Sequence, residues 1–332
     1  MRRILITLFV LAALGCGLCV VGGCSSMKKS EVESRLLALA KNQPIREAGL
    51  RVKSGEAVIG GVRLPVEYRW HAAGTSGPVV VLVHGTPSSL VSWTEVVHGG
   101  PGYAGLAQSC RVLALDVVGH GTTRTELDAY SFQKCADWVA GFLDLLELTD
   151  VTLVGQSYGG EFAWRAALDR PERVSRVVLM SSSGFPRRDD EWLPEEVKMR
   201  ELSLAKFGWL LNSRERLRPA LDLHFAQPSP DERIEEYFLV CENSDNWRAM
   251  IDLARDENGA RSGDLARLTQ PCLLLWGERD VAYRPERFGQ LFADTIPRAR
   301  WSPVPGAGHY PHEEQPALVA RAIAQFAQEG AR

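Results

Sequence analysis

VTLVGQSYGG, residues 151–160, is the stretch that decides the fold: an apolar run ends at a serine between two glycines, and a helical pattern follows. Where a buried strand turns directly into a helix at such a serine, the backbone is strained and the hydroxyl is lifted clear of the sheet. Side chains at Gly155 and Gly159 would collide with the flanking strand and helix. We therefore predict that Ser157 is a nucleophile and that the amide of Tyr158 faces the oxygen of the group attacked.

Taken alone, this motif is equally compatible with an ordinary glycine turn, so the surrounding sequence has to supply a matching sheet. Continuous apolar runs separated by helix-like stretches do recur, at residues 79–83, 112–115, 151–154, 177–180 and 272–276. Strands covered on both faces have this composition, and the expected fold class is therefore α/β with a doubly wound, mostly parallel sheet. Apolar stripes at helical spacing within residues 132–146 and 318–326 are expected to be core helices.

An alternating segment precedes the first apolar run. From Val62 to Trp70 the even positions are apolar and the odd positions are polar or proline, which predicts a half-exposed strand. Gly60-Gly61 before it predicts a hairpin turn. Proline cannot donate to a sheet ladder, so Pro65 predicts that this strand lies at a sheet edge.

Candidate partners of Ser157 follow three other strand-like runs, at the edge where a doubly wound sheet holds its site. HGTP at residues 84–87 brings the Thr86 amide forward as a second oxyanion donor, although a plain strand-ending turn is the alternative. GERD at 277–280 supplies Asp280, and GAGH at 306–309 supplies His309, with small residues that give the imidazole room to move. The chain order Ser, Asp, His allows the acid to fix the imidazole tautomer while the other ring nitrogen takes the serine proton.

With these motifs the chain resembles an alpha/beta-hydrolase of the capped group that includes haloalkane dehalogenases, epoxide hydrolases, carbon-carbon bond hydrolases and small esterases. The resemblance extends from about residue 50 to the end of the chain. The motifs that carry it are HGTP at 84–87, DVVGHG at 116–121, GQSYGG at 155–160, WGERD at 276–280 and GAGHYPHEEQP at 306–316.

One departure from this group decides the chemistry that the resemblance implies. Dehalogenases and epoxide hydrolases carry an aspartate at the elbow, where this chain has Ser157, so acyl chemistry is implied instead. Some members keep the acid after the preceding strand, but residues 180–183 read MSSS and offer no carboxylate. Asp280 is therefore the predicted acid, and its only rival is Asp116, which sits in a structural loop in the family.

Three further histidines have structural interpretations. His84 and His120 are expected to brace loops by hydrogen bonding, and His312 follows the predicted base at a helix entry. Residues 186–265 break the strand-helix alternation with polar helical segments and scattered aromatics, which predicts an inserted helical cap whose aromatics mainly hold the cap together. These aromatics include Trp192, Phe207, Trp209, Phe225, Tyr237 and Trp247.

The N-terminus is predicted to direct export. Met1-Arg2-Arg3 precedes apolar residues 4–14, which is the build of a secretory signal. Small residues at 21–23 then lead directly into Cys24 and resemble the bacterial lipobox. That resemblance implies a signal peptide of residues 1–23, lipidation of the Cys24 thiol, and a lipoprotein anchored in the bacterial envelope membrane on its periplasmic or outer face. An uncleaved apolar anchor and cleavage before Cys16 remain alternatives.

The rest of the chain divides into two predicted parts. Residues 24–48 are expected to form a lipidated tether and a lead-in helix, with residues 25–29 as the polar tether and an apolar face at Val32, Leu36, Leu39 and Ala40. Residues 49–332 are expected to form the hydrolase domain with its cap.

The composition excludes several other classes. A chain with 45% hydrophobic and 24% charged residues is ordinary for a globular protein. Loss of Arg2 and Arg3 with a signal peptide would change the net charge from −3 to −5, and such an acidic domain gives no reason to expect nucleic-acid binding. The cysteines outside the targeting segment fit no disulfide framework and no paired metal site, and are expected to be buried free thiols. They are Cys110, Cys135, Cys241 and Cys272.

The function predicted from the sequence is a serine hydrolase with an acyl-enzyme intermediate, in which Ser157, His309 and Asp280 form the triad and no metal or cofactor takes part. A small-molecule carboxylic ester is the expected substrate. A carbon-carbon bond or amide hydrolase, a cofactor-free perhydrolase and a non-catalytic binding module remain alternatives, because the cap sets the pocket. The sequence does not indicate an oligomeric state.

Overall fold

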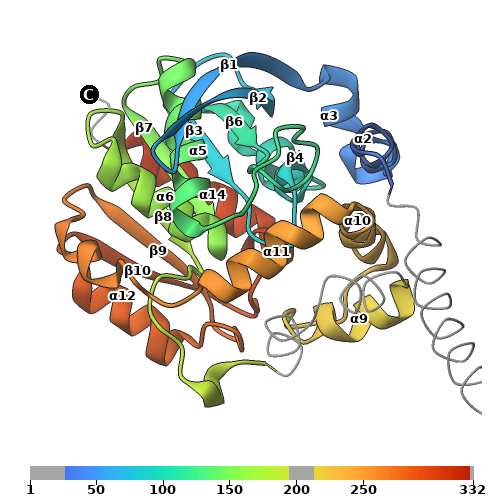
Figure 1. Ribbon diagram of the computed structural model, residues 1–332. Helices are drawn as coiled ribbons and strands as arrows, with labels where there is room; N and C mark the ends of the chain where they lie inside the picture. Colours follow the sequence, from blue (N-terminus) through green and yellow to red (C-terminus); the bar gives the residue numbers. More distant parts are fainter. Residues whose placement is uncertain (1–26, 194–212, 330–332) are drawn as a thin grey trace, which may run out of the picture.

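The structure is a computed structural model that describes residues 27–193 and 213–329. In this part of the chain an eight-stranded sheet is covered by helices, and two very short strands pair separately (Figure 1). The strands of the large sheet are β1 (Arg51–Ile59), β2 (Val62–Ala73), β3 (Val79–Val83), β6 (Arg111–Leu115), β7 (Val151–Gln156), β8 (Val174–Met180), β9 (Cys272–Gly277) and β10 (Ala299–Val304). The short pair is β4 (Gly99–Gly100) with β5 (Tyr103–Ala104).

The strand order across the large sheet is β1-β2-β6-β3-β7-β8-β9-β10. From β6 to β10 every neighbouring pair is parallel, whereas β1 pairs antiparallel with β2, and β2 antiparallel with β6. The predicted doubly wound, mostly parallel sheet is therefore confirmed. All parallel strands end at one edge of the sheet, which is where the candidate site residues follow them.

The central strands are buried on both faces, as their continuous apolar runs predicted. In β3, Val81 and Val83 belong to one hydrophobic cluster, while Val80 and Leu82 belong to a second cluster on the opposite face. Because side chains alternate along a strand, an apolar residue is needed at every position.

Helices cover both faces of the sheet. The first cluster includes apolar side chains of α5 (Phe132–Leu145), α6 (Tyr158–Asp169) and α12 (Gln290–Thr295), and the second includes those of α4 (Thr94–His98) and α14 (Pro316–Gln328). Both helices expected from apolar stripes, α5 and α14, are present. Short elements complete the core: η2 (Leu90–Trp93), η3 (Leu106–Gln108), the π-helical turn η6 (Pro285–Gly289) and α13 (Pro311–Glu314).

The β1–β2 hairpin corrects one expectation. The turn at Gly60-Gly61 is present, with Ile59 opposite Val62. The edge strand, however, is β1 and not β2, because β2 also pairs with β6. That second pairing covers only Trp70 to Ala73 of β2, so Pro65 faces a strand on one side alone. The missing N–H of Pro65 is tolerated for that reason.

Between β8 and β9 the described residues form helices joined by loops, and no strand lies among them. The helices are η4 (Asp189–Glu191), α9 (Arg214–Asp222), α10 (Asp231–Cys241), α11 (Ser244–Asp256) and η5 (Ser262–Arg267). Two of the predicted cap aromatics, Phe207 and Trp209, lie outside the described residues. Phe225 and Tyr237 pack with Tyr310 in a third hydrophobic cluster, which joins the inserted helices to the segment that follows His309.

The lead-in segment is packed onto the inserted helices. It forms α2 (Lys29–Ala38), η1 (Ala40–Asn42) and α3 (Gln43–Ala48), and Val32 and Leu36 are fully buried in the second cluster together with Leu239 and Val240 of α10. Figure 1 shows α2 beside α10.

The end of the predicted polar tether differs from expectation. The main-chain N–H of Met27 donates to Glu242 O, Asn243 donates to Met27 O, and the Lys29 ammonium donates to Asn246 Oδ1. Residues 27–29 are therefore fastened to the start of α11, because the inserted helices offer them hydrogen-bond partners that the sequence does not reveal.

Two further expectations concern membranes and thiols. Among residues 27–193 and 213–329, no helix is both long enough and apolar enough to cross a membrane. Cys24 and the predicted signal peptide lie outside the described residues. The expectation of buried free thiols is confirmed for Cys110, Cys135, Cys241 and Cys272.

Candidate active site

Ser157 occupies a strained turn between β7 and α6. Its backbone angles are φ 54° and ψ −124°, a conformation that side-chain-bearing residues rarely adopt. A Cβ on Gly155 would lie 2.2 Å from Gly159 O, and one on Gly159 would lie 2.3 Å from His84 O. Both glycines are therefore required by close backbone approach, as the elbow motif predicted.

The structure brings Ser157, His309 and Asp280 together, although they follow three different strands. Nε2 of His309 is 3.0 Å from Ser157 Oγ, and Nδ1 is 3.0 Å from Asp280 Oδ2. All three residues are at most 4% exposed. Because a carboxylate only accepts, Nδ1 of His309 carries the proton, and in the neutral ring Nε2 accepts from the serine hydroxyl. This is the geometry that base-assisted attack by a hydroxyl requires.

The loop after β9 fixes Asp280 from the other side. Its Oδ1 accepts hydrogen bonds from the main-chain N–H groups of Ala282 and Tyr283, at 2.9 and 3.0 Å. Oδ2 is thereby directed to the imidazole. An acid held at both oxygens can orient His309 without changing its rotamer.

Of the small residues before His309, Gly308 is required by close packing, a role that the sequence did not show. A Cβ on Gly308 would lie 2.5 Å from His224 O, within the inserted helical segment. The main-chain N–H of His309 donates to that same carbonyl at 2.7 Å, and Gln156 Nε2 donates to His309 O at 2.8 Å. His309, the predicted base, is thus held by its main chain on both sides.

Glu314 adds a second tie at this place. Its Oε1 accepts from the N–H of Gly308 at 2.8 Å, and its Oε2 accepts from the N–H of Ala226 at 2.7 Å. Burial raises the pKa of the Glu314 carboxyl, and the hydrogen bonds from Ala226 and Gly308 oppose that shift. One carboxylate therefore joins the histidine loop to the loop after α9.

The HGTP loop lies directly against the serine. A Cβ on Gly85 would be 2.9 Å from Ser157 Cβ, so this loop approaches the nucleophile as closely as glycine allows. Thr86 is half-buried, and its hydroxyl lies 2.7 Å from Nε2 of His120. Of the two residues predicted to donate to an oxyanion, Tyr158 directly follows Ser157, and Thr86 follows Gly85, which lies against Ser157.

The expected bracing histidines make the hydrogen bonds predicted for them. His84 pairs Nδ1 with Gly85 O at 2.8 Å and accepts the N–H of Val117 at Nε2. His120 pairs Nδ1 with Val118 O and Nε2 with the Thr86 hydroxyl. Burial lowers the pKa of His84 and lowers that of His120 to about 3, so both rings are neutral with Nδ1 protonated.

Asp116, the rival acid, is fully buried in a structural role. Its Oδ1 accepts from Leu90 N at 2.7 Å, and its Oδ2 accepts from the N–H and the hydroxyl of Thr122, at 2.7 and 2.6 Å. A Cβ on Gly121 would collide with this carboxylate. Asp116 thus braces the loop after β6, and His309 is paired with Asp280.

Two buried glutamates near Ser157 were not predicted from the sequence. Glu161, one turn into α6, pairs with Arg165 and accepts from the Ser183 hydroxyl at 2.9 Å, while the N–H of Ser183 donates to Ser157 O at 3.2 Å. Burial raises the pKa of Glu161 to about 7. The second, Glu257, accepts from the hydroxyl of Tyr158 at 2.6 Å. The only sign of these glutamates in the sequence was that Glu161 lies one helical turn after Ser157.

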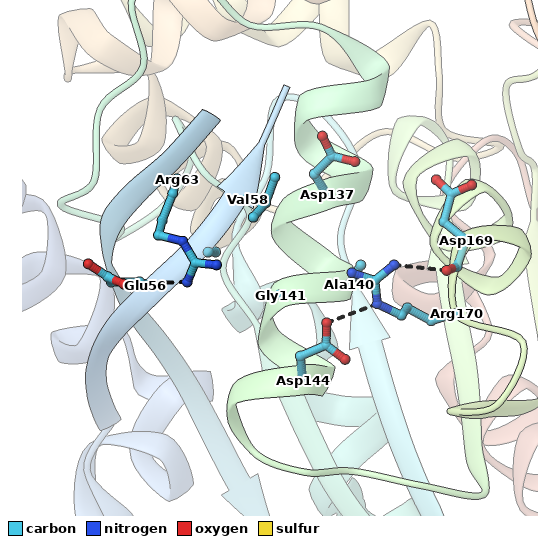
Figure 2. A pocket seen from close by; sticks show the side chains of 10 residues that line it. Glu56, Val58, Arg63, Asp137, Ala140, Gly141, Asp144, Asp169 and Arg170 are labelled. Atoms are coloured by element: carbon cyan, nitrogen blue, oxygen red, sulfur yellow. Dashed lines mark hydrogen bonds and ion pairs between the residues drawn. The ribbon is translucent and has the colours of Figure 1, made fainter. Parts of the chain in front are cut away.

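Other candidate sites are poorer. A cavity of about 200 Å³ lies between the β1–β2 hairpin and α5, where Glu56, Arg63, Asp144 and Arg170 line it (Figure 2). Its charges are already paired, Arg63 with Glu56 and Arg170 with Asp144, and it contains none of the predicted site residues. Within the described residues, no group of three or more His, Cys, Asp or Glu side chains is arranged to hold a metal ion.

Comparison with known sequences identifies the family of this chain. The profile of the family described as "Alpha/beta hydrolase family" matches residues 80–322. The uncharacterized hydrolase YugF of Bacillus subtilis is 29% identical over 263 residues, which cover 78% of this chain and 93% of YugF. Proteins named haloalkane dehalogenase are also among the relatives.

Solved structures show the same fold. A membrane phospholipase A, described as a bacterial virulence factor, matches with a TM-score of 0.71 and 24% identity over 99% of this chain and 100% of its own. A thermophilic esterase from Thermogutta terrifontis matches with a TM-score of 0.67 and 23% identity over 83% of this chain and 98% of its own. At these identities the likeness establishes the fold alone.

Proposed function

Because the chain belongs to the alpha/beta hydrolase family, we propose that it is a serine hydrolase that cleaves carboxylic esters of small to medium molecules through an acyl-enzyme on Ser157. One observation carries this proposal: a buried imidazole, His309, is hydrogen-bonded at one nitrogen to a strained serine and at the other to Asp280. A serine at the elbow also distinguishes this chain from family members that use an aspartate there.

In the first half-reaction, Ser157 Oγ attacks the ester carbonyl carbon while Nε2 of His309 takes the hydroxyl proton. The carbonyl oxygen becomes an oxyanion, which the main-chain N–H groups of Thr86 and Tyr158 stabilise. The bond from carbon to the alkoxide oxygen then breaks, and the leaving oxygen takes the proton from His309. The alcohol departs and the acyl group stays on Ser157.

In the second half-reaction, His309 removes a proton from water as the water oxygen attacks the acyl carbon. The bond to Ser157 Oγ breaks, the serine recovers its proton, and the carboxylic acid leaves. Asp280 keeps its hydrogen bond to Nδ1 of His309 and stabilises the imidazolium that forms twice in each cycle. Removing one oxyanion donor from such a site costs about 100-fold or more in rate.

A lipid ester is a second candidate substrate. The likeness to a membrane phospholipase A extends over 99% of this chain, which is more than the 83% matched by the esterase. In addition, Met27, which follows the predicted export segment, is fastened to the start of α11. An N-terminal anchor would therefore hold the inserted helices near the membrane surface. A carbon-carbon bond or amide hydrolase and a perhydrolase would use the same triad.

The test combines a nucleophile variant with a substrate panel. Ser157→Ala and His309→Ala should each lose at least about 1,000-fold in kcat, and the double variant should lose little more, because the two side chains act as a unit. A fluorophosphonate probe should label Ser157 alone. A Ser157→Ala protein that keeps more than about a tenth of the wild-type rate would overturn the proposal.

The panel separates the substrate classes. Purified protein is assayed with aryl esters of increasing chain length, lactones, phospholipid vesicles, an amide and a carbon-carbon substrate. Turnover of the carbon-carbon substrate alone would reject the ester proposal. Turnover of vesicles but not of soluble esters would favour the lipid candidate.

We also propose that the protein is an exported lipoprotein. In this proposal residues 1–23 are removed, Cys24 carries the lipid, residues 24–48 connect it to the enzyme, and residues 49–332 form the hydrolase domain with a cap at about 186–265. The basic start, the apolar run and the small residues before Cys24 support it. Stable attachment needs at least two acyl chains, since a single chain binds only marginally.

A further inference from the structure

One buried carboxylate connects the loop of the nucleophile to the loop of the acid. Glu257, directly after α11, accepts a hydrogen bond from the Tyr158 hydroxyl at Oε2 (2.6 Å) and from the Tyr283 hydroxyl at Oε1 (2.7 Å). The glutamate is 4% exposed. Both contacts are therefore shielded from water, and a hydrogen bond in such a low-dielectric interior is stronger than the same bond at the surface.

Each tyrosine is rigidly connected to the proposed triad. Tyr158 directly follows Ser157, and its amide is one of the two proposed oxyanion donors. The N–H of Tyr283 donates to Asp280 Oδ1, and the Tyr283 ring lies 5.4 Å from the imidazole of His309, measured between ring centres. A movement of either ring away from Glu257 would displace the main chain next to a reacting group.

Glu257 is itself held in place from two directions. Arg187 forms an ion pair with Glu257 Oε1 at 3.8 Å, with both side chains 1% exposed, and its guanidinium lies 5.1 Å from the Tyr283 ring. Just before Glu257, the α11 residues Asp252 and Asp256 accept the N–H groups of Tyr130 and Phe132. The end of α11 is thus fixed to the start of α5, and Glu257 has little freedom to follow either tyrosine.

We propose that Glu257 is a positioning residue: its carboxylate fixes the amide of Tyr158 relative to Asp280 and His309, so that the oxyanion donor and the base are aligned on the same carbonyl. The inference rests on the proposed serine hydrolase function and assigns to the inserted helices a part in the rate of the chemical step. In this role the tyrosine hydroxyls position the main chain through their hydrogen bonds to Glu257 and take no part in proton transfer.

The experiment measures kcat and KM on an ester and the rate at which a fluorophosphonate phosphonylates Ser157, both per folded molecule. Glu257→Ala should lower kcat and the phosphonylation rate by about 10- to 100-fold, with KM within about threefold of wild type, because a misplacement of about 1 Å costs up to about that factor. Glu257→Gln should recover most of the rate. Its amide oxygen can accept from one tyrosine and its NH₂ can donate to the other.

Tyrosine variants test the two contacts separately. Tyr158→Phe and Tyr283→Phe should each lower kcat, and adding both to Glu257→Ala should cause no further loss, because the bridge is already absent. Full additivity of the three changes would overturn the proposal, since independent effects would not share a bridge.

Glu236→Ala is the matched control. Glu236 is also a buried glutamate of the inserted helices paired with a cation, but its partner is Lys41 of the lead-in segment and not a residue of the nucleophile or acid loop. The change should lower stability and leave kcat within about twofold, because Glu236 does not act on the reacting groups. An equal loss of kcat in Glu236→Ala and Glu257→Ala would show general damage to the inserted helices and overturn the proposal.

These experiments distinguish a failure of the positioning role from a failure of the proposed serine mechanism. If Ser157→Ala is inactive and Glu257→Ala keeps kcat within about twofold of wild type, serine catalysis stands and the positioning role is wrong. If Ser157→Ala remains active, the serine mechanism itself is wrong, and with it the positioning role.

Discussion

The main-chain N–H of His309 donates a 2.7 Å hydrogen bond to the main-chain carbonyl of His224. His224 lies in the loop after α9, among the inserted helices, and the two imidazole rings are 5.6 Å apart between centres. The proposed base is thus joined to the insertion by its own backbone. Any movement of the loop after α9 changes the position of His309 directly.

Glu314→Ala is expected to lower activity through this junction. The change leaves the N–H groups of Gly308 and Ala226 without the carboxylate that joins them, and because both hydrogen bonds are partly exposed the cost is about 1 kcal/mol for each. Since Gly308 precedes His309, we expect kcat to fall by about tenfold or more. Steady-state kinetics of Glu314→Ala, Glu314→Gln and the exposed control Glu329→Ala would check this. An unchanged kcat in a folded Glu314→Ala protein would contradict it.

Asp116→Asn is expected to reduce stability more than catalysis. The amide that replaces the carboxylate would present N–H groups toward Leu90 N or Thr122 N, which are themselves donors, at a cost of about 2–4 kcal/mol in the free energy of unfolding. Urea unfolding measures that loss, and kcat per folded molecule should stay within about threefold. If folded Asp116→Asn protein is inactive while Asp280→Asn protein is active, the roles assigned to the two acids must be exchanged.

Glu161 is expected to give a pH-dependent stability. Burial raises its pKa from 4.5 to about 7, so between these values the folded protein holds a proton that the unfolded chain has released. The free energy of unfolding should therefore fall as the pH rises from about 4.5 to about 7, by at most about 3 kcal/mol from this group, and this contribution should be constant above about pH 7. Unfolding curves of Glu161→Gln across this range should lack that decrease, while the exposed control Glu56→Gln should retain it. Equal slopes for wild type and Glu161→Gln would contradict the assignment.

The lead-in segment is expected to stabilise the enzyme. Lys41 of η1 forms an ion pair with Glu236 of α10, whose side chain is 2% exposed. Lys41→Met would leave this carboxylate buried without its cation and should reduce the free energy of unfolding by about 3–5 kcal/mol. Chemical denaturation of a chain that begins at Met27 provides the measurement, with the exposed Lys28→Met as control. A loss below about 1 kcal/mol would show that the pair contributes little.

Cys24→Ala is expected to block lipidation and signal cleavage. The precursor would then remain attached through its apolar segment, whereas the wild type would carry lipid on Cys24. Metabolic labelling with a palmitate analogue distinguishes the two states. Absence of label on the wild type, or label that persists on Cys24→Ala, would favour the uncleaved anchor or processing before Cys16.

Much of the fold was predictable because the central strands are buried on both faces and therefore appear in the sequence as unbroken apolar runs. The triad was predictable because Ser157 and Asp280 follow such runs and His309 follows a weaker strand-like segment that ends at Val304. The prediction that β2 is the edge strand was wrong, since the sequence does not show that the end of β2, beyond Pro65, also pairs with β6.

The contacts of the inserted helices were not predictable. Glu257 and Tyr158 are 99 residues apart, and nothing in either local sequence indicates that a helix after β8 returns over the nucleophile. The burial of Glu161 and Glu257, and the partial burial of Glu314, likewise depend on how distant segments dock. A carboxylate in a polar helical stretch is usually exposed, so its sequence context gives the opposite expectation.

The backbone conformation of Ser157 also bears on which residue type would be favoured at this position. A conformation with φ near 54° and ψ near −124° costs a residue with a Cβ about 1–3 kcal/mol, whereas glycine adopts it freely. If folding alone determined the residue at this position, glycine would be the favoured choice, as it is at 155 and 159. A serine here makes the protein less stable than a glycine would, which agrees with the role proposed for its hydroxyl.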